Sequence, residues 1–393
     1  MKQLEMERSS PRKLENETQP LMTNTTVNFL SYGGGVDSSA LLAMVLNRDR
    51  AAEHLGITRE KLDEALPPIV AAVFSDPGSE WPETYENIAY AEKRCAEIEL
   101  PLQTVRHTIN VYLHRETGEE LRYTQWKKLD KELKADYEKT PRVYKIFEWL
   151  MDGASFPVIP GGSGHICSMR FKGQVQQKWA DETYGNHEVC TKHWLLGIEA
   201  EEAGRSDRFT ANRRKNDIKG KRILGHTYGY PLMDLGMSRK ECLEMLEVLG
   251  WDYKGDGSPV QKSSCMWCPF VKEWEVDRLV DADGRGLQEA LAIEENFYQK
   301  DKHAQWHADG EPVKSNGTCF AGHHRQPYAT GYCDKPECSD SNKHGKATLI
   351  SLRYPNDGSQ PFAKGKVRMT VKEHIKRRRD ALLSEELSRF LTE

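Results

Sequence analysis

Residues 31–39 read SYGGGVDSS, between the apolar stretches VNFL (27–30) and ALLAMVL (40–46). The first stretch is short and bounded by polar residues, as in a buried parallel strand. From Asp37 onward, apolar residues recur at helical spacing. Glycines in such a turn let successive backbone N–H groups converge on one anion, and the positive end of the helix adds to the attraction. The stretch therefore predicts either a tight turn or a phosphate-binding loop.

The loop does not match two common nucleotide-binding motifs. No Gly-Lys-Ser/Thr follows the glycines, which excludes a Walker A loop. Residues 36–38 supply no third glycine in register, which excludes the dinucleotide fingerprint of Rossmann folds.

Further apolar runs alternate with helical patterns along the first three hundred residues. They predict strands at 69–74, 102–107 and 193–198, and a helix at about 82–98. This alternation predicts an α/β fold with a doubly wound parallel sheet, whose ligands bind at the carboxyl ends of its strands. The segments SYGGGVDSS, SDPGSE and GIEAEEAGR all follow expected strands and would therefore meet at that edge.

Composition divides the chain into three parts: a disordered tail over 1–25, a nucleotide-binding domain over 26–300, and a Cys/His-rich, then basic, region over 301–393. Within the domain, residues 108–165 are rich in Lys and Glu and predict a helical insertion. SRKE (238–241) has the pattern of a helix capping box.

The formal net charge of −4 gives no overall attraction to nucleic acid. Basic clusters at 212–222 and 376–379 either contact nucleic-acid phosphates or are solvated faces. The sequence has no apolar run long enough to span a membrane, and its N-terminal residues lack an apolar signal core. We therefore expect no membrane association and a cytoplasmic location.

Cys265-x-x-Cys268-Pro has the spacing of a metal or redox site. Two thiolates at this spacing can hold an iron–sulfur cluster, form half of a zinc site, or act as a redox pair. Free thiols are the remaining alternative.

A second cysteine group lies at 319–338. It predicts a possible Zn²⁺ knuckle, with a loop of free Cys and His as the alternative. Its candidate ligands are Cys319, His323 (or His324), Cys333 and Cys338.

The motifs, taken together in order, resemble a known family. SYGGGVDSSALL resembles the pyrophosphate loop, Ser-Gly-Gly-x-Asp-Ser, of the adenine-nucleotide alpha-hydrolase (PP-loop ATP pyrophosphatase) superfamily. FSDPGSEWPETYENI, CSMRFK (167–172) and WLLGIEAEEAGRSDR resemble successive motifs of its phosphoadenylyl-sulfate (PAPS) reductase branch. YPLMDLGMSRKECLEML and SSCMWCPFVKEW complete the series, which spans roughly residues 26–300. The resemblance implies a PAPS reductase-like fold and an adenine nucleotide ligand.

The resemblance assigns the phosphate loop to residues 33–39. The backbone N–H groups of Gly34 to Ser38 would hold the phosphates. Gly33 stands where the family pattern has its first serine, and Ser31 lies two places earlier. Ser38 and Ser39 would supply the side-chain contacts.

Charged side chains complete the implied nucleotide site. Asp37 would hold Mg²⁺ or a phosphate-bound water, and it can also cap the helix. Asp76 would bind adenine, ribose or Mg²⁺, with turn formation as the alternative. Lys172 and Arg205 would neutralise phosphate or sulfate, with solvated surface charges as the alternative.

The resemblance also adds Cys167 to Cys265 and Cys268 as ligands of a [4Fe–4S] cluster. The fourth ligand would be a C-terminal cysteine, another group, or nothing.

These features predict an enzyme that binds ATP or an adenylyl nucleotide and couples chemistry at the alpha phosphate to sulfur transfer. The acceptor would be a nucleic acid or a small molecule, and a protein would donate sulfur or electrons. Reduction of PAPS or adenylyl sulfate is an alternative, although the sequence lacks the Glu-Cys-Gly-x-His element of assimilatory reductases. A non-catalytic nucleotide- or nucleic-acid-binding module is the other alternative.

Overall fold

The structure is a computed structural model of the whole chain. It describes residues 25–153, 166–202, 225–251, 264–268, 273–282, 284–300, 350–353, 366–369 and 375–376. The tail predicted over 1–25 lies almost wholly outside these residues.

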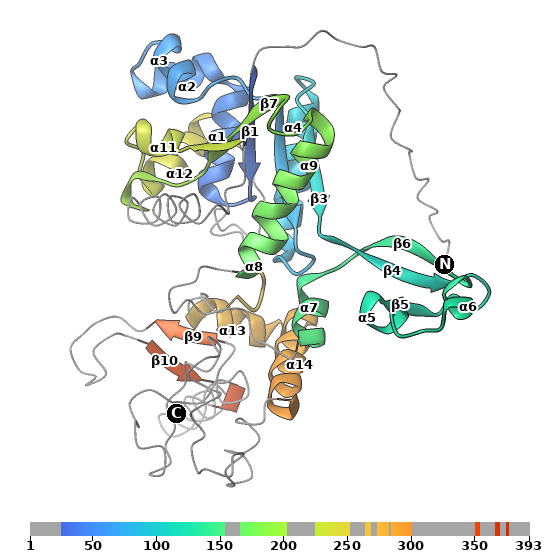
Figure 1. Cartoon of the computed structure of the whole chain (residues 1–393). Coiled ribbons are helices and arrows are strands. Elements are labelled where there is room, and N and C mark those ends of the chain that lie inside the picture. The colour runs from blue at the N-terminus through green and yellow to red at the C-terminus, as the bar shows by residue number, and fades with distance from the viewer. Residues whose placement is uncertain are drawn as a thin grey trace, which may run out of the picture.

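The central sheet contains five parallel strands in the order β3-β2-β1-β7-β8 (Figure 1). Its strands are β1 (Thr25–Tyr32), β2 (Ala71–Asp76), β3 (Leu102–Arg106), β7 (Cys190–Leu196) and β8 (His226–Gly229). The order runs from β1 outward through β2 and β3 on one side, and through β7 and β8 on the other. The chain therefore has the doubly wound α/β fold that the alternating pattern predicted.

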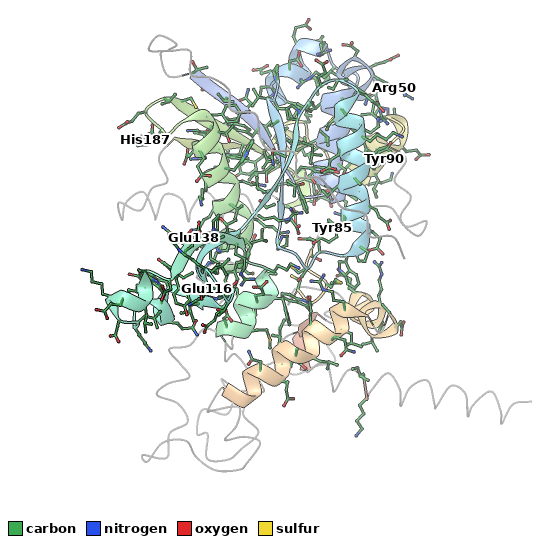
Figure 2. The ribbon with its side chains drawn as sticks, turned by 90° about the vertical axis from the view of Figure 1, so that its right-hand side faces the viewer. Arg50, Tyr85, Tyr90, Glu116, Glu138 and His187 are labelled. Atoms are coloured by element: carbon green, nitrogen blue, oxygen red, sulfur yellow. The ribbon has the colours of Figure 1, made fainter. Side chains whose placement is uncertain are left out.

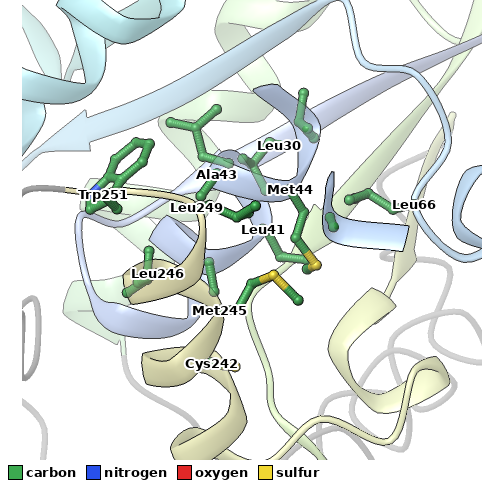
Figure 3. Close-up of a cluster of buried hydrophobic side chains, with 14 of the residues drawn as sticks. Leu30, Leu41, Ala43, Met44, Leu66, Cys242, Met245, Leu246, Leu249 and Trp251 are labelled. Carbon is green, nitrogen blue, oxygen red and sulfur yellow. The ribbon is translucent and has the colours of Figure 1, made fainter. Parts of the chain in front are cut away.

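Three long helices cover one face of the sheet: α1 (Val36–Leu46), α4 (Pro82–Ala96) and α12 (Arg239–Val248). Leu30 of β1 packs there with Leu41 and Met44 of α1 and with Met245 of α12 (Figure 3). Shorter helices adjoin them: α2 (Arg48–Leu55), α3 (Arg59–Ala65) and α11 (Pro231–Asp234). Ser238 and Glu241 form the predicted capping box at the start of α12.

The opposite face is covered by α9 (Gln174–Tyr184). Phe29 of β1 stacks on Trp194 of β7 and meets Trp179 and Tyr184 of this helix edge to face. Because β1 buries alternate residues against the two layers, its register is fixed in the middle of the sheet.

The insertion predicted to be helical over 108–165 contains helix α7 (Ile146–Gly153), but the residues before α7 are built mainly on strands. An antiparallel sheet of β4 (Thr108–His114), β5 (Glu120–Arg122) and β6 (Tyr137–Val143) projects beside the main sheet, with only short helices α5 (Tyr123–Trp126) and α6 (Lys131–Lys134). Tyr112 stacks on Trp126 at 4.1 Å between ring centroids. The Lys and Glu residues that suggested a helix lie on a small sheet with little core, where polar side chains face water.

The remaining elements lie below the sheet in Figure 1. They are α7 (Ile146–Gly153), α8 (Ile166–Ser168), a π-helical turn (Met169–Gly173), α13 (Glu273–Asp281), α14 (Arg285–Lys300), β9 (Ile350–Arg353) and β10 (Lys366–Met369). A short 3-10 turn (Ala200–Glu202) follows β7. Among the described residues, no helix has the length and apolar character that crossing a membrane requires.

Candidate nucleotide and thiol site

The glycine loop lies where the strand order reverses. It follows β1, and the loop that begins at Gly197 follows the neighbouring strand β7. In doubly wound sheets, the crevice between two such strands is where ligands bind. The fold therefore places SYGGGVDSS at the position expected of a nucleotide site.

Backbone and side-chain contacts close the loop around the start of α1. Ser38 Oγ accepts a hydrogen bond from Gly33 N at 3.2 Å and donates one to Gly35 O at 3.2 Å. Gly34 has φ +74°, a left-handed conformation that favours glycine. A side chain at Gly34 would also meet Thr84 and Ile88 of α4 at 3.2 Å. Gly34 is thus required by the shape of the loop.

Gly197 brings the end of β7 against the first turn of α1. A Cβ atom at this position would lie 2.7 Å from Ser38 N and 3.0 Å from Asp37 C. These are backbone atoms, which cannot move aside as a flexible side chain can. Gly197 is therefore required for the close approach of the two loops.

Asn87 of α4 is fully buried and forms hydrogen bonds with the glycine loop. Its Nδ2 donates to Gly34 O at 2.7 Å and to Ser39 Oγ at 3.1 Å. Its Oδ1 accepts from Trp251 Nε1 at 3.3 Å. One amide thus ties the loop, the first helix and the segment after α12 together.

The predicted serines lie in different surroundings. Ser39 is fully buried, and its hydroxyl is shared with Asn87 and, at 3.2 Å, with Tyr32 OH. Ser31 Oγ donates to Gln176 Oε1 of α9 at 2.9 Å. These contacts favour a supporting role for Ser39 and Ser31, while Ser38 stays in the loop itself.

Charged side chains lie beside Asp37, where the strand order of the sheet reverses. Arg239 Nη1, in the first turn of α12, lies 3.6 Å from Asp37 Oδ1. Cys242, one turn further along α12, is fully buried; burial, followed by the Asp37 and Glu199 carboxylates, raises the pKa of its thiol to about 12. Cys242 is thus a packed thiol, as its helical setting predicted, while Asp37 and Arg239 border the loop.

Asp76 is held by three hydrogen bonds at the end of β2. Its Oδ1 accepts from Gly78 N and from Tyr85 OH, each at 2.8 Å, and its Oδ2 accepts from Arg106 Nε at 2.9 Å. Figure 2 shows Tyr85 near the end of α4 that adjoins this turn. Burial, followed by Asp76, raises the pKa of Tyr85 well above its usual range, so its hydroxyl remains a donor. These contacts favour the turn-forming alternative for Asp76.

The Cys-x-x-Cys loop is joined to the segment that follows β2. Cys265 pairs with Glu80 in an isolated antiparallel bridge, and Met266 N donates to Ser79 O at 2.9 Å. Cys268 N donates to Cys265 O at 3.0 Å, which closes the loop as a turn. The segment 76–80 therefore connects the nucleotide edge of the sheet to the cysteines.

Glu289 of α14 fixes this junction. Its Oε2 accepts from Ser79 Oγ at 3.0 Å and from Trp267 Nε1 at 2.9 Å. Its Oε1 accepts from Arg285 Nε at 2.7 Å. Since Trp267 lies between the two cysteines and is fully buried, this buried carboxylate sets the position of the whole loop.

Glu80 and Lys172 form an ion pair at the cysteines, with 2.6 Å between Oε1 and Nζ. The Glu80 side chain is 0% exposed, and its Oε2 has no hydrogen-bond partner among the described residues. Burial acts to lower the pKa of Lys172, but Glu80, helped by Cys265 and Cys268, raises it. Lys172 is therefore a cation already matched by a buried carboxylate.

A π-helical turn places Cys167 and Lys172 near each other. The turn runs from Met169 to Gly173 and continues α8, the short helix that contains Cys167. Such turns are rare and frequently occur at functional sites. Burial raises the pKa of the Cys167 thiol, while the Lys172 charge acts to lower it.

The three cysteines share one environment. Cys167, Cys265 and Cys268 all pack against the same buried cluster, which includes Trp267 and Phe171. Burial, followed by Glu80, raises the pKa of Cys265 well above its usual range, and the other two cysteines act in the same direction. The structure thus gathers the three predicted cysteines around one buried cluster.

The donor set suits an iron–sulfur cluster in its chemistry, because three thiols and an unpaired carboxylate oxygen adjoin one another. The side chains as they lie do not form a ready metal site. Within the described ranges, no group of three or more His, Cys, Asp or Glu side chains is arranged to hold a metal ion. We therefore derive no chemical step through a cluster.

Comparison with known families decides the identity of the first part of the chain. Residues 27–150 match the family model of the phosphoadenosine phosphosulfate reductase domain. Over these residues, the chain is similar to that domain. No curated protein sequence matches the chain.

The match covers β1 through most of α7, including the glycine loop and the segment 76–80. It ends before Cys167 and before Gly197. The PAPS reductase-like domain supports a role in nucleotide-linked sulfur chemistry, and the motifs beyond residue 150 remain predictions.

Several predicted residues lie outside the described ranges. They are Arg205 and the second cysteine group, Cys319, His323, Cys333 and Cys338. Their predicted roles in phosphate binding and in a zinc knuckle are untested.

Sequence reasoning assigned no role to several residues of the PAPS reductase-like site. Gly197, Glu80 and Asn87 lie inside the quoted motifs, and Arg239 lies inside the capping box. The only signal for them was this proximity to the motifs. Glu289 had no signal, because its partners are distant in the sequence.

Proposed function

We propose that the protein is a PP-loop enzyme that binds ATP or a related adenylyl nucleotide and couples alpha-phosphate chemistry to sulfur transfer. The observation that carries this proposal is the continuous path from the glycine loop, through the segment 76–80, to Cys265. A nucleotide at the loop and a sulfur atom at the cysteines would then act in one site.

The loop would bind the phosphates through the backbone N–H groups of Gly34 to Ser38. Asp37 would hold Mg²⁺ together with phosphate oxygens, since Mg²⁺ is commonly bound by one or two carboxylates and substrate phosphates. This arrangement would place the alpha phosphate over the positive end of α1.

The reaction would proceed in two displacements. An acceptor oxygen attacks the alpha phosphorus, the bond to pyrophosphate breaks, and pyrophosphate leaves. A sulfur donor at the oxidation level of sulfide then attacks the activated carbon of the acceptor, and AMP leaves with the oxygen. No electrons are required beyond those of the donor.

Cys167, Cys265 and Cys268 form the sulfur side of the site. They would hold the [4Fe–4S] cluster, which would supply a place to bind or deliver sulfur. Lys172, which pairs with Glu80, also lies beside these thiols, and its positive charge would favour their deprotonated form.

Reduction of PAPS or adenylyl sulfate is the second candidate. The matched domain and the group of thiols favour it. In that reaction a thiolate attacks the sulfonate sulfur, the nucleotide leaves, and a second thiol releases sulfite with formation of a disulfide.

Two labelled substrates distinguish these reactions. The reduced, anaerobically purified protein is incubated with γ-labelled ATP and candidate nucleic-acid or small-molecule acceptors and, separately, with ³⁵S-labelled PAPS and a dithiol. Pyrophosphate release from ATP supports the first proposal, and sulfite release from PAPS supports the second. Nucleotide binding without either product would leave a non-catalytic module.

Iron, zinc and acid-labile sulfide are measured on the same preparation and on Cys265→Ser. Iron and sulfide that are lost in the variant would support the cluster. Zinc alone, without iron and unchanged in the variant, would instead point to residues 319–338 and would contradict a cluster at Cys265.

A further inference from the structure

Arg239 lies close to the glycine loop, at the point where the strand order of the sheet reverses. It is the first residue of α12, and the loop after β7 joins this corner because Ala200 N donates to Met237 O at 2.8 Å. Its side chain is 42% exposed, so a ligand at the loop can reach it.

The ion pair between Arg239 and Asp37 is weak. Arg239 Nη1 and Asp37 Oδ1 are 3.6 Å apart, which is an ion-pair distance but is longer than a good hydrogen bond. The arginine side of this pair is open to water, and an ion pair that is solvated on one side contributes only modestly to stability. Exchange of partners would therefore cost little.

A nucleotide would offer both groups a better partner. Phosphate oxygens accept two parallel hydrogen bonds from a guanidinium, and carboxylates bind Mg²⁺. The Asp37 side chain is 16% exposed, so it stays within reach of a cation at the loop. The same event would thus give Arg239 a phosphate and Asp37 a metal ion.

We propose that Arg239 is a phosphate-binding residue that moves from Asp37 to the nucleotide phosphates when the Mg²⁺–nucleotide complex binds. This inference rests on the proposed function, because it requires a nucleotide at the glycine loop. It identifies the phosphates, not the adenosine, as the part of the ligand that Arg239 recognises.

Lys240 provides a matched control. It is the next residue on the same helix and carries the same charge, but its side chain is 85% exposed and pairs with Glu244 at 3.3 Å. Arg239→Gln and Lys240→Gln therefore remove equal charge from the same turn of α12, at two different distances from the loop.

The experiment is titration calorimetry of the full chain with ATP, AMP and adenosine, each with Mg²⁺. Arg239→Gln should lower the affinity for ATP and AMP by at least tenfold and leave the affinity for adenosine unchanged. Lys240→Gln should leave all three unchanged. Thermal unfolding of each variant checks that the fold is retained.

The exchange of partners makes a second prediction. Removing Mg²⁺ should weaken ATP binding more in the wild type than in Arg239→Gln, because only the wild type must separate Arg239 from Asp37. Equal Mg²⁺ dependence in the two proteins would contradict the exchange.

The possible outcomes separate this inference from the proposed function. If the wild type binds none of the three ligands, both fail. If the wild type binds ATP and Arg239→Gln binds it equally well, only the role of Arg239 fails. An equal loss for ATP and adenosine would also contradict a phosphate contact.

Discussion

Lys172 Nζ lies 2.6 Å from Glu80 Oε1, and the carboxylate of this pair has no exposed surface while the ammonium is 33% exposed. The two residues come from different parts of the fold, the π-helical turn before α9 and the segment after β2. The pair joins them at the point where Cys265 bridges to Glu80. Replacing Lys172 and replacing Glu80 should therefore lower the free energy of unfolding by different amounts.

Lys172→Met should be the more damaging substitution, because it leaves a buried carboxylate without its cation. We expect a loss of about 3 kcal/mol in the free energy of unfolding, at the lower end for a broken buried pair because Lys172 is partly exposed. Glu80→Gln should cost less, since Lys172 can turn toward water.

Urea denaturation of both variants and of the double variant tests this asymmetry. The double variant should be more stable than the sum of the single losses predicts. Additive losses would mean that the two side chains do not interact.

Asn87→Asp tests the support of the glycine loop. The carboxylate has nearly the shape of the amide but cannot donate to Gly34 O, and it places a charge in a fully buried position. We expect a loss of about 2 kcal/mol or more in stability, and a fall in ATP affinity.

Tyr90→Phe is the control for this change. Tyr90 lies further along α4, and its hydroxyl contacts Gly250 O and Arg94 instead of the loop (Figure 2). This variant should bind ATP as the wild type does. If Asn87→Asp also binds ATP normally, the buried amide does not shape the loop.

Glu289→Gln should loosen the Cys-x-x-Cys loop. The amide has only one accepting oxygen and cannot receive the bonds from Ser79, Trp267 and Arg285 together. We expect Cys265 and Cys268 to be alkylated by iodoacetamide several-fold faster in the folded protein.

Glu295→Gln, on the exposed side of the same helix, should leave the alkylation rate unchanged. Equal rates in the wild type and Glu289→Gln would show that other contacts position the loop.

His107 should make stability depend on pH. Burial, followed by the Arg170 and Lys178 charges, lowers its pKa, and its Nε2 has no hydrogen-bond partner in the described parts of the chain. Below about pH 6.5, the ordinary histidine pKa, the unfolded chain takes up a proton before the folded protein does. Stability should therefore be complete above this pH and fall below it.

His107→Phe should reduce this acid sensitivity, since an aromatic ring can keep the contact with Phe171. Thermal midpoints from pH 7.5 to pH 5.5 should fall less steeply in the variant than in the wild type. Parallel curves would assign the acid sensitivity to other groups, such as His193, whose pKa burial also lowers.

The central sheet could be predicted from the sequence because its signals are local. The apolar runs at 27–30 and 69–74 lie within β1 and largely within β2, and the glycines mark the turn between strand and helix. The order of motifs along the chain was then enough to place three loops at one edge of the sheet. The family match over residues 27–150 confirms the resemblance for that part.

The projecting sheet could not be recognised from its Lys and Glu content. Tyr112, Trp126 and the strands around them form a structure with little buried surface, so no strong apolar pattern marks it. The alternating polar and apolar residues of TINVYLH (108–114) were the signal that composition concealed.

The contacts that complete the site could not be predicted because they join distant segments. The Glu80–Cys265 bridge and the bonds of Glu289 depend on how α14 packs under the sheet. Asn87 is one polar residue in an ordinary helical pattern. Nothing in that pattern indicates that its amide donates a hydrogen bond to Gly34 O.

The most direct test of the account is the affinity of the protein for ATP when the glycine loop alone is changed. Gly34→Val places a branched side chain in a left-handed conformation inside the loop, at φ +74°. Gly56→Val imposes the same kind of strain at φ +63°, after α2, where a Cβ atom would meet nothing within 4 Å. In titration calorimetry with Mg²⁺, we predict that the wild type and Gly56→Val bind ATP alike and that Gly34→Val loses at least tenfold in affinity. A wild type that does not bind ATP, or a Gly34→Val variant that binds it as well as Gly56→Val does, would contradict nucleotide binding at this loop.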